Sequence, residues 1–380
     1  MKNDNEEISI LFPPSERKAE LEQKQRVLQE FLTANALDAY LISRHENIAW
    51  ATAGLVDVHV GIPREVGVGS LLIAREGKSY YLTTNNEAPR LADEEFAHLN
   101  YEPIIQPWHA NDVQAAIRTA IGKGKVAADD ATNGLPVVSM KPLRLPLTEG
   151  EIVRYRWLGE HIADAATETL LALRPGMTEF QMQAMIGERL LAESIQPSVF
   201  LTAADDRIRK YRHAVPREGV LQHYGMLNFC ARRWGLCISI TRFVYFGAMP
   251  GELHEKFAAV ARVNASLLHT TREGAAADSL FTTAQMGYAV QGYPGEEQMH
   301  HQGGATGYWE REWIARPGGR ERVLGQQAMA WNPTIQGAKI EDTVVLTGGT
   351  IEILTATPRL PVVETNCQGT IYRSAGVLLV

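Results

Sequence analysis

The sequence contains few cysteines and no long apolar run, and each shortage excludes a class of protein. Cys230, Cys237 and Cys367 are its only cysteines in 380 residues, too few for the disulfide framework of a small secreted domain. Their spacing matches no zinc-binding pattern, so the sequence predicts reduced thiols in a cytoplasmic protein. No window approaches the ~18 consecutive apolar residues of a membrane-spanning helix, and the acidic residues 1–7 are not followed by the apolar core of a signal peptide.

Positive charge is also scarce. The 37 lysines and arginines are outnumbered by 44 aspartates and glutamates, which gives a net charge of −7. Since nucleic acids and anionic membranes bind to a basic face, the sequence predicts neither as a partner. What remains is the composition of an ordinary globular protein, with 45% apolar and 21% charged residues, and a length sufficient for two domains.

Helix-like and strand-like patterns alternate through the N-terminal part of the chain. The helical patterns lie at 15–35, with Ser15 as predicted cap, and at 112–121, and the strand-like runs lie at 36–42, 66–74, 78–83, 100–105 and 126–128. The alternation predicts an α/β domain over residues 1–145. Its predicted end lies within 129–147, a segment with turn residues and three prolines.

The second part, residues 146–380, has a different order of helical and strand-like patterns. Helical patterns lie at 155–173, 178–193 (with Thr178 as predicted cap) and 251–273, and strand-like runs lie at 226–246 and from 292 onward. Long helices segregated from a run of strands predict an α+β domain rather than a doubly wound sheet. The apolar end of 360–380 is predicted to add an edge strand or a dimer contact.

Four short patches of this second part carry a resemblance to a known family. They lie at 211–216 (Tyr-Arg-His-Ala-Val-Pro), 227–230, 300–304, and 330–333 followed by 339–343. In their order and spacing the chain resembles the M24 family of creatinase, Xaa-Pro aminopeptidases and prolidases. The resemblance implies a creatinase-like α/β domain (1–145), a pita-bread catalytic domain (146–380), and a homodimer whose partner helps to close the cleft.

The metal-binding positions of this family are largely neutral in the present sequence. In the metallopeptidases these positions hold two Asp, one His and two Glu, whereas here they read Asn228, Ser239, His301, Asn332 and Glu341. Two divalent ions need hard anionic oxygens around them, so the loss of three carboxylates predicts a pseudo-metallopeptidase with no metal. The alternative is one divalent metal at His301 and Glu341, with a third ligand from His213 or His300.

Creatinase lacks the metals and hydrolyses a C–N bond with a catalytic histidine, whose place in the family pattern is taken here by His213. An imidazole exchanges protons near neutral pH, so His213 is the predicted acid and base. His301 lies in a Gly-rich turn and is predicted to stabilise a developing oxyanion. The alternative is that His301 has no catalytic role and is a former metal ligand that now forms a hydrogen bond with Glu341. Glu341 is predicted to orient a histidine or the substrate. The alternative is a structural role, in which Glu341 forms an ion pair with Lys339 or Arg242.

The remaining candidate residues are predicted to contact a small-molecule substrate. They are Tyr211, Asn228, Ser239, Tyr308, Arg311, Asn332 and, from the N-terminal domain, Arg64. Neutral side chains suit an uncharged amide or amidine, and the fork of an arginine suits a carboxylate.

The resemblance therefore implies a metal-independent, creatinase-type hydrolase of a C–N bond in a small amide, amidine or peptide-like substrate. One alternative is an Xaa-Pro aminopeptidase or dipeptidase that works with a reduced metal site. Another is a non-catalytic protein that keeps the cleft for ligand binding.

Overall fold

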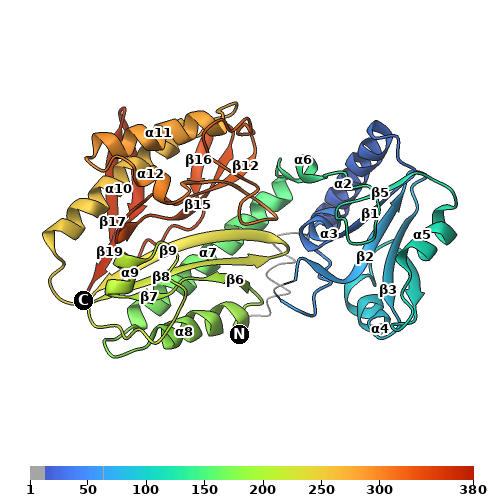
Figure 1. Cartoon of the computed structure of the whole chain (residues 1–380), viewed down its shortest axis with the longest axis horizontal. Coiled ribbons are helices and arrows are strands. Elements are labelled where there is room, and N and C mark those ends of the chain that lie inside the picture. Colours follow the sequence, from blue (N-terminus) through green and yellow to red (C-terminus); the bar gives the residue numbers. More distant parts are fainter. Residues whose placement is uncertain (1–12, 63) are drawn as a thin grey trace. The chain divides into compact units, whose positions relative to one another are not determined.

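The computed structural model describes residues 13–62 and 64–380, which form two compact units (Figure 1). The first unit comprises Met1–Glu151 with Trp234–Leu236, and the second comprises Ile152–Arg233 and Cys237–Val380. The predicted domain boundary after residue 145 falls in the short segment between α6 (Lys141–Arg144) and α7 (Glu149–Ala172).

The first unit is built on a mixed five-stranded sheet in the order β4-β3-β2-β1-β5. Its strands are β1 (Ala39–Arg44), β2 (Val66–Ala74), β3 (Ser79–Thr84), β4 (Glu102–Gln106) and β5 (Val126–Ala128). Its further helices are α2 (Pro14–Ala34), α3 (His45–Ala51), α4 (Ala88–Arg90), η1 (Leu91–Glu95) and α5 (Val113–Ile121). Apolar side chains of the central strands pack with Ile117 of α5 in one buried core, as the alternating α/β pattern predicts.

The start of α2 differs from its prediction. The helix begins at Pro14, and no side chain caps it, so the prediction of Ser15 as cap is wrong. Proline suits the first helical position because it lacks the N–H group that would be left without a partner there.

The long helices of the second unit are α7 from Ile152 onward, α8 (Glu179–Ala192), α10 (Gly251–Thr270) and α11 (Ala277–Val290). The short ones are α9 (Asp206–Lys210) and α12 (Glu296–Met299). Thr178 caps α8 as predicted. Its hydroxyl accepts from the backbone N–H of Gln181 (3.2 Å), and the Gln181 side chain accepts from the backbone N–H of Thr178 (2.8 Å).

The second unit is built on two larger sheets. One has the order β19-β9-β8-β6, with β7 paired to β8, and the other has the order β11-β10-β12-β15-β16. The first contains β6 (Gln196–Phe200), β7 (Ala203–Ala204), β8 (Tyr224–Arg233), β9 (Leu236–Tyr245) and β19 (Val377–Leu379). The second contains β10 (Gly303–Thr306), β11 (Trp313–Ile314), β12 (Gln327–Trp331), β15 (Asp342–Thr347) and β16 (Thr350–Ile353). The helices are thus segregated from the strands, which confirms the predicted α+β class.

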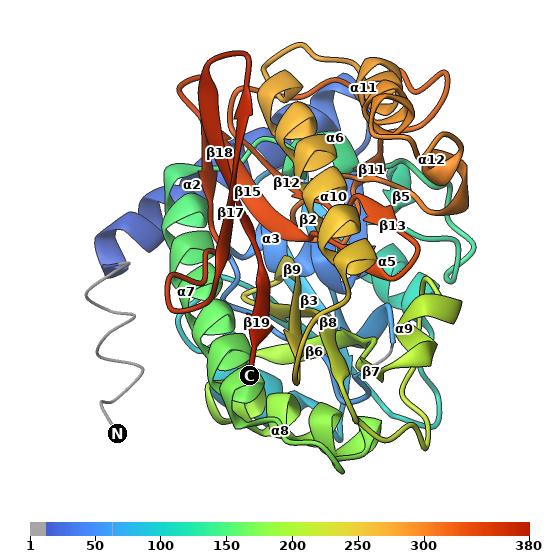
Figure 2. The same ribbon diagram turned by 90° about the vertical axis from the view of Figure 1, so that its left-hand side faces the viewer.

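Two hairpins complete this unit, β13 (Thr334–Ile335) with β14 (Ala338–Lys339), and β17 (Val362–Cys367) with β18 (Thr370–Ala375). Figure 2 shows α10 beside the β17–β18 hairpin, where Asn264 donates to the hydroxyl of Ser374 (3.0 Å). The end of the chain confirms the edge-strand prediction, since β19 joins the edge of its sheet beside β9.

Among the helices of residues 13–62 and 64–380, none is long and apolar enough to cross a membrane. The cytoplasmic location and the homodimer stay predictions.

Candidate functional site

The carboxylate of Glu341 lies at the centre of the candidate site, on the segment that leads into β15. Asn228 of β8 and Thr241 of β9 both donate to its Oε2, at 2.5 and 2.7 Å. The backbone N–H of Thr241 also donates to the carbonyl of Glu341 (3.2 Å), which joins β9 to this segment. Because alternate residues of a strand share a face, Ser239 and Thr241 point the same way from β9.

Two side-chain cations hold Glu341. The Lys339 ammonium lies 2.9 Å from Oε2, and Arg311 Nη2 lies 2.9 Å from Oε1. Glu341 is 2% exposed, and such burial by itself disfavours the ionised form. The two cations outweigh that cost and hold the pKa of this carboxyl well below its usual range. The predicted pairing with Lys339 is therefore present, whereas Arg242 pairs instead with Asp342 (2.7 Å).

Three histidines lie close together beside this cluster. His213 follows α9, His300 follows α12, and His301 lies two residues before the start of β10. The Nε2 atoms of His213 and His300 are 2.9 Å apart, so one ring donates to the other, and the rings of His300 and His301 are stacked 4.4 Å apart. One nitrogen from each of the three can be chosen so that all lie within 4.8 Å of one another.

The local electrostatics keep these imidazoles neutral. Burial and the charge of Lys339 lower the pKa values of His213 and His300, and burial and Arg311 lower the pKa of His301 to about 4. His213 is the most exposed of the three and is therefore the one that water reaches most easily. A neutral imidazole open to water is the form that a general base requires.

The residues present do not fit the two metal ions of the metallopeptidases. Both oxygens of Glu341 already accept from protein donors, and the Ser239 hydroxyl accepts from Arg311 Nη1 (2.9 Å). Asn228, Ser239 and Asn332 offer only neutral oxygens, and Arg311 and Lys339 bring positive charge into the same space. Within residues 13–62 and 64–380, the three histidines are the donor set of the kind that a single zinc-like ion accepts.

The other predicted residues are placed as follows. Asn332 is buried, its backbone N–H donates to Gln302, and its Oδ1 has no partner among the described residues. Tyr308 is fully buried. Tyr211 is half-exposed, with the Arg207 guanidinium 5.2 Å from its ring, and it lines a small cavity with Lys339. Arg64 belongs to the first unit, and its role stays a prediction.

Sequence reasoning missed Thr241 and the pairing of His213 with His300. Thr241 had a local signal, since it lies two residues after Ser239 in the same apolar strand pattern and so shares its face. The contact between His213 and His300 had no local signal, because 87 residues separate them, although the family patches had placed both as possible third ligands beside His301.

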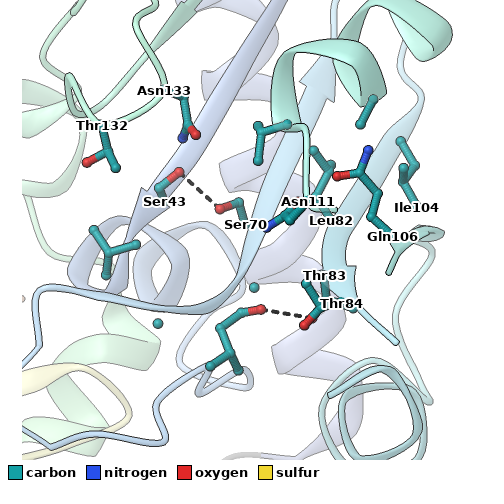
Figure 3. A pocket seen from close by; sticks show the side chains of 16 residues that line it. Ser43, Ser70, Leu82, Thr83, Thr84, Ile104, Gln106, Asn111, Thr132 and Asn133 are labelled. Carbon is teal, nitrogen blue, oxygen red and sulfur yellow. Dashed lines mark hydrogen bonds between the residues drawn. The ribbon is translucent and has the colours of Figure 1, made fainter. Parts of the chain in front are cut away.

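The first unit contains a separate cavity of about 260 Å³ (Figure 3). Its polar lining includes Ser43 and Ser70, whose hydroxyls are 3.0 Å apart, together with Gln106, Asn111 and Asn133. The described residues that line it include no titratable group, so this cavity lacks an acid or a base. The candidate for chemistry is therefore the cluster around Glu341.

The comparisons with known proteins also point to the second unit, which contains the cluster around Glu341. Half of the chain, residues 159–348, matches the family described as Metallopeptidase family M24, and no curated protein matches the chain. The fold is similar to that of the Xaa-Pro dipeptidase from Bacillus anthracis, at 16% identity and a TM-score of 0.72, over 95% of this chain and 100% of that one.

Two further solved structures resemble this chain at nearly the same TM-score. The dipeptidase PepE from Mycobacterium ulcerans shares 18% identity at a TM-score of 0.73, over 95% of this chain and 99% of that one. The prolidase from Pyrococcus horikoshii OT3 shares 18% identity at a TM-score of 0.72, over 88% of this chain and 98% of that one. Identities this low show a shared fold, which is the pita-bread fold that the sequence patches predicted.

Proposed function

The chain belongs to metallopeptidase family M24, a family of hydrolases, and on this premise we propose that it is a metal-independent hydrolase of the creatinase type. Its proposed reaction is hydrolysis of a C–N bond in a small amide, amidine or peptide-like substrate. The observation that supports the proposal most is the contact between the neutral imidazoles of His213 and His300, beside a Glu341 whose oxygens are bonded to protein cations.

In the proposed reaction His213 is the general base and then the general acid. It takes a proton from the water that attacks the carbon of the C–N bond, and it returns that proton to the departing nitrogen. His300 holds the His213 ring by their Nε2 contact of 2.9 Å and so fixes its direction. This is a positioning role, because it acts through the neighbouring ring.

Charge on the attacked group is proposed to be stabilised by His301 and Arg311. The Nδ1 atom of His301 and the Nε atom of Arg311 are buried and have no hydrogen-bond partner within the described part of the chain. Donors of this kind gain most when a negatively charged oxygen develops near them in the transition state.

The charge balance of the cavity favours a substrate with a carboxylate. Arg311 and Lys339 together carry one more charge than Glu341 neutralises, and the three neighbouring histidines are neutral. A buried excess positive charge attracts an anion, and a guanidinium binds a carboxylate especially well. Asn228 and Asn332 are proposed to orient the neutral amide or amidine part of the same molecule.

Removal of metal is expected to leave the activity unchanged. The purified protein would be treated with a chelator, dialysed, analysed for metal content and assayed with creatine, guanidinoacetate, N-acyl amino acids and Xaa-Pro dipeptides. We expect kcat/KM of the substrate that is turned over to be the same before and after chelation. Loss of activity that manganese or zinc restores would contradict metal independence.

The three-histidine cluster gives the second candidate, an Xaa-Pro aminopeptidase or dipeptidase with one metal ion, a specific structural basis. The same chelation experiment separates it from the first. A stoichiometric metal ion that disappears when His300 is replaced by Gln would favour this second candidate.

The pH dependence of turnover provides an independent test of His213. As a base it must be neutral, and partial burial and Lys339 lower its pKa. Protonation therefore requires a pH below about 6.5, the ordinary value for histidine. We expect kcat/KM to stay constant as the pH falls through about 6.5 and to decline only at lower pH. An acid limb centred above this value would contradict the assignment.

A further inference from the structure

We infer that Arg311 and Lys339 are built-in replacements for the two metal cations of the fold, which balance the charge of Glu341 and keep divalent ions out. The inference concerns how the cavity is neutralised. It therefore does not depend on which bond the enzyme cuts.

The geometry places one protein cation on each oxygen of Glu341. Arg311 Nη2 is 2.9 Å from Oε1, and Lys339 Nζ is 2.9 Å from Oε2. Arg311 also donates through Nη1 to the hydroxyl of Ser239, at 2.9 Å. Since the guanidinium is a rigid planar fork, one arginine bridges two positions that carry metal ligands in the metallopeptidases.

The pairing of Lys339 with Glu341 is a consequence of the local chain. Lys339 ends β14, Glu341 immediately precedes β15, and the buried Ile340 separates them. In an extended chain alternate side chains project to the same side, so Lys339 and Glu341 meet while Ile340 packs in the opposite direction. The cation is thus tied to the carboxylate by two peptide units.

The charge balance of the cavity explains why two singly charged side chains, and not two divalent metal ions, neutralise it. Two divalent ions need about four carboxylates, but Asn228, Ser239 and Asn332 are neutral and leave one negative charge. A lone buried carboxylate is costly unless it is paired and hydrogen-bonded. Lys339 and Arg311 provide that pairing, and the excess of one positive charge then repels any further cation.

The contacts also occupy the coordination positions. Oε2 accepts from Lys339, Asn228 and Thr241, and Oε1 accepts from Arg311. A metal ion that bound Glu341 would have to displace both the buried Lys339 and the Arg311 guanidinium. Restoring the missing carboxylates alone is therefore insufficient to recover a metal site.

The experiment compares two variants for manganese content by elemental analysis after equilibration with Mn²⁺ and gel filtration. The first, N228D/S239D/N332E, restores the three carboxylates and retains both cations. The second adds R311Q and K339M. We expect the first to bind substoichiometric Mn²⁺ and the second to bind about two ions per chain, the number that four carboxylates and His301 can hold. About two ions per chain in the first variant would overturn the inference.

A simpler variant covers the case in which the fivefold variant does not fold. R311Q/K339M leaves every other residue unchanged and frees Glu341, so that Glu341 with His301 and one neighbouring histidine can hold a single ion. We expect Mn²⁺ to raise its melting temperature and not that of the wild type, because a ligand that binds only the folded state stabilises it. The same response in both proteins, or in neither, would overturn the inference. Neither result would alter the conclusions drawn from chelation about the reaction.

Discussion

Replacement of His213 by Gln is expected to lower kcat by roughly 10²–10⁴-fold, the usual contribution of a general acid or base. Glutamine has nearly the size of histidine and can form hydrogen bonds, but it cannot exchange a proton near neutral pH. The measurement is the steady-state rate with the substrate found in the panel of amides, amidines and dipeptides. Because His213 acts on the reacting atoms, kcat should fall much more than KM changes.

The matched control is His254→Gln, the same change at an exposed histidine of α10. It should leave both kcat and the melting temperature unchanged. The competing interpretation of His213, a side chain that only braces the turn before Pro216, predicts the opposite pattern for H213Q. In that case the melting temperature would fall while kcat of the folded protein stayed at the wild-type value.

His300→Gln separates a positioning role from a catalytic one. This variant retains His213 but removes its partner at Nε2. We attribute direction, not proton transfer, to His300. Its loss should therefore reduce kcat less than the loss of His213, and it should leave the acid limb of the pH profile in place.

The local parts of this fold could be predicted from the sequence because their causes are local. The capping box at Thr178 and the alternation that brings Lys339 next to Glu341 each depend on residues two or three positions apart. The patches at 211–216 and 300–304 also identified the histidines that the structure brings together.

The partners of Glu341 illustrate what the sequence could not supply. Arg311 reaches Glu341 across 30 residues and Ser239 across 72, and no periodicity relates these positions. The binding of a substrate carboxylate by Arg311 stays a prediction, and its contacts with Glu341 and Ser239 were not predicted. Only the packing of β9, β10 and the segment before β15 decides this, and that packing is a property of the whole unit.

Glu341→Gln is expected to destabilise the protein by about 3–5 kcal/mol, because it leaves the buried Lys339 and the largely buried Arg311 without their anion. Lys339 and the Arg311 side chain are 7% and 12% exposed, so water replaces little of the lost interaction. The free energy of unfolding would be measured by denaturation in urea. The control is Glu352→Gln, which breaks an exposed pair with Arg156 (2.8 Å) and should cost at most about 1 kcal/mol.

A charge-balanced variant completes the test of this cluster. R311M/K339M should also be destabilised, since it leaves the Glu341 carboxylate buried without a cation. R311M/K339M/E341Q removes all three charges together, so it should be more stable than E341Q although it contains two additional substitutions. Such strong non-additivity is the signature of groups that act through one another. If the costs of E341Q and R311M/K339M simply add in the triple variant, the three charges do not form one balanced unit, and Glu341 owes its ionised state to the surrounding hydroxyl and amide donors instead.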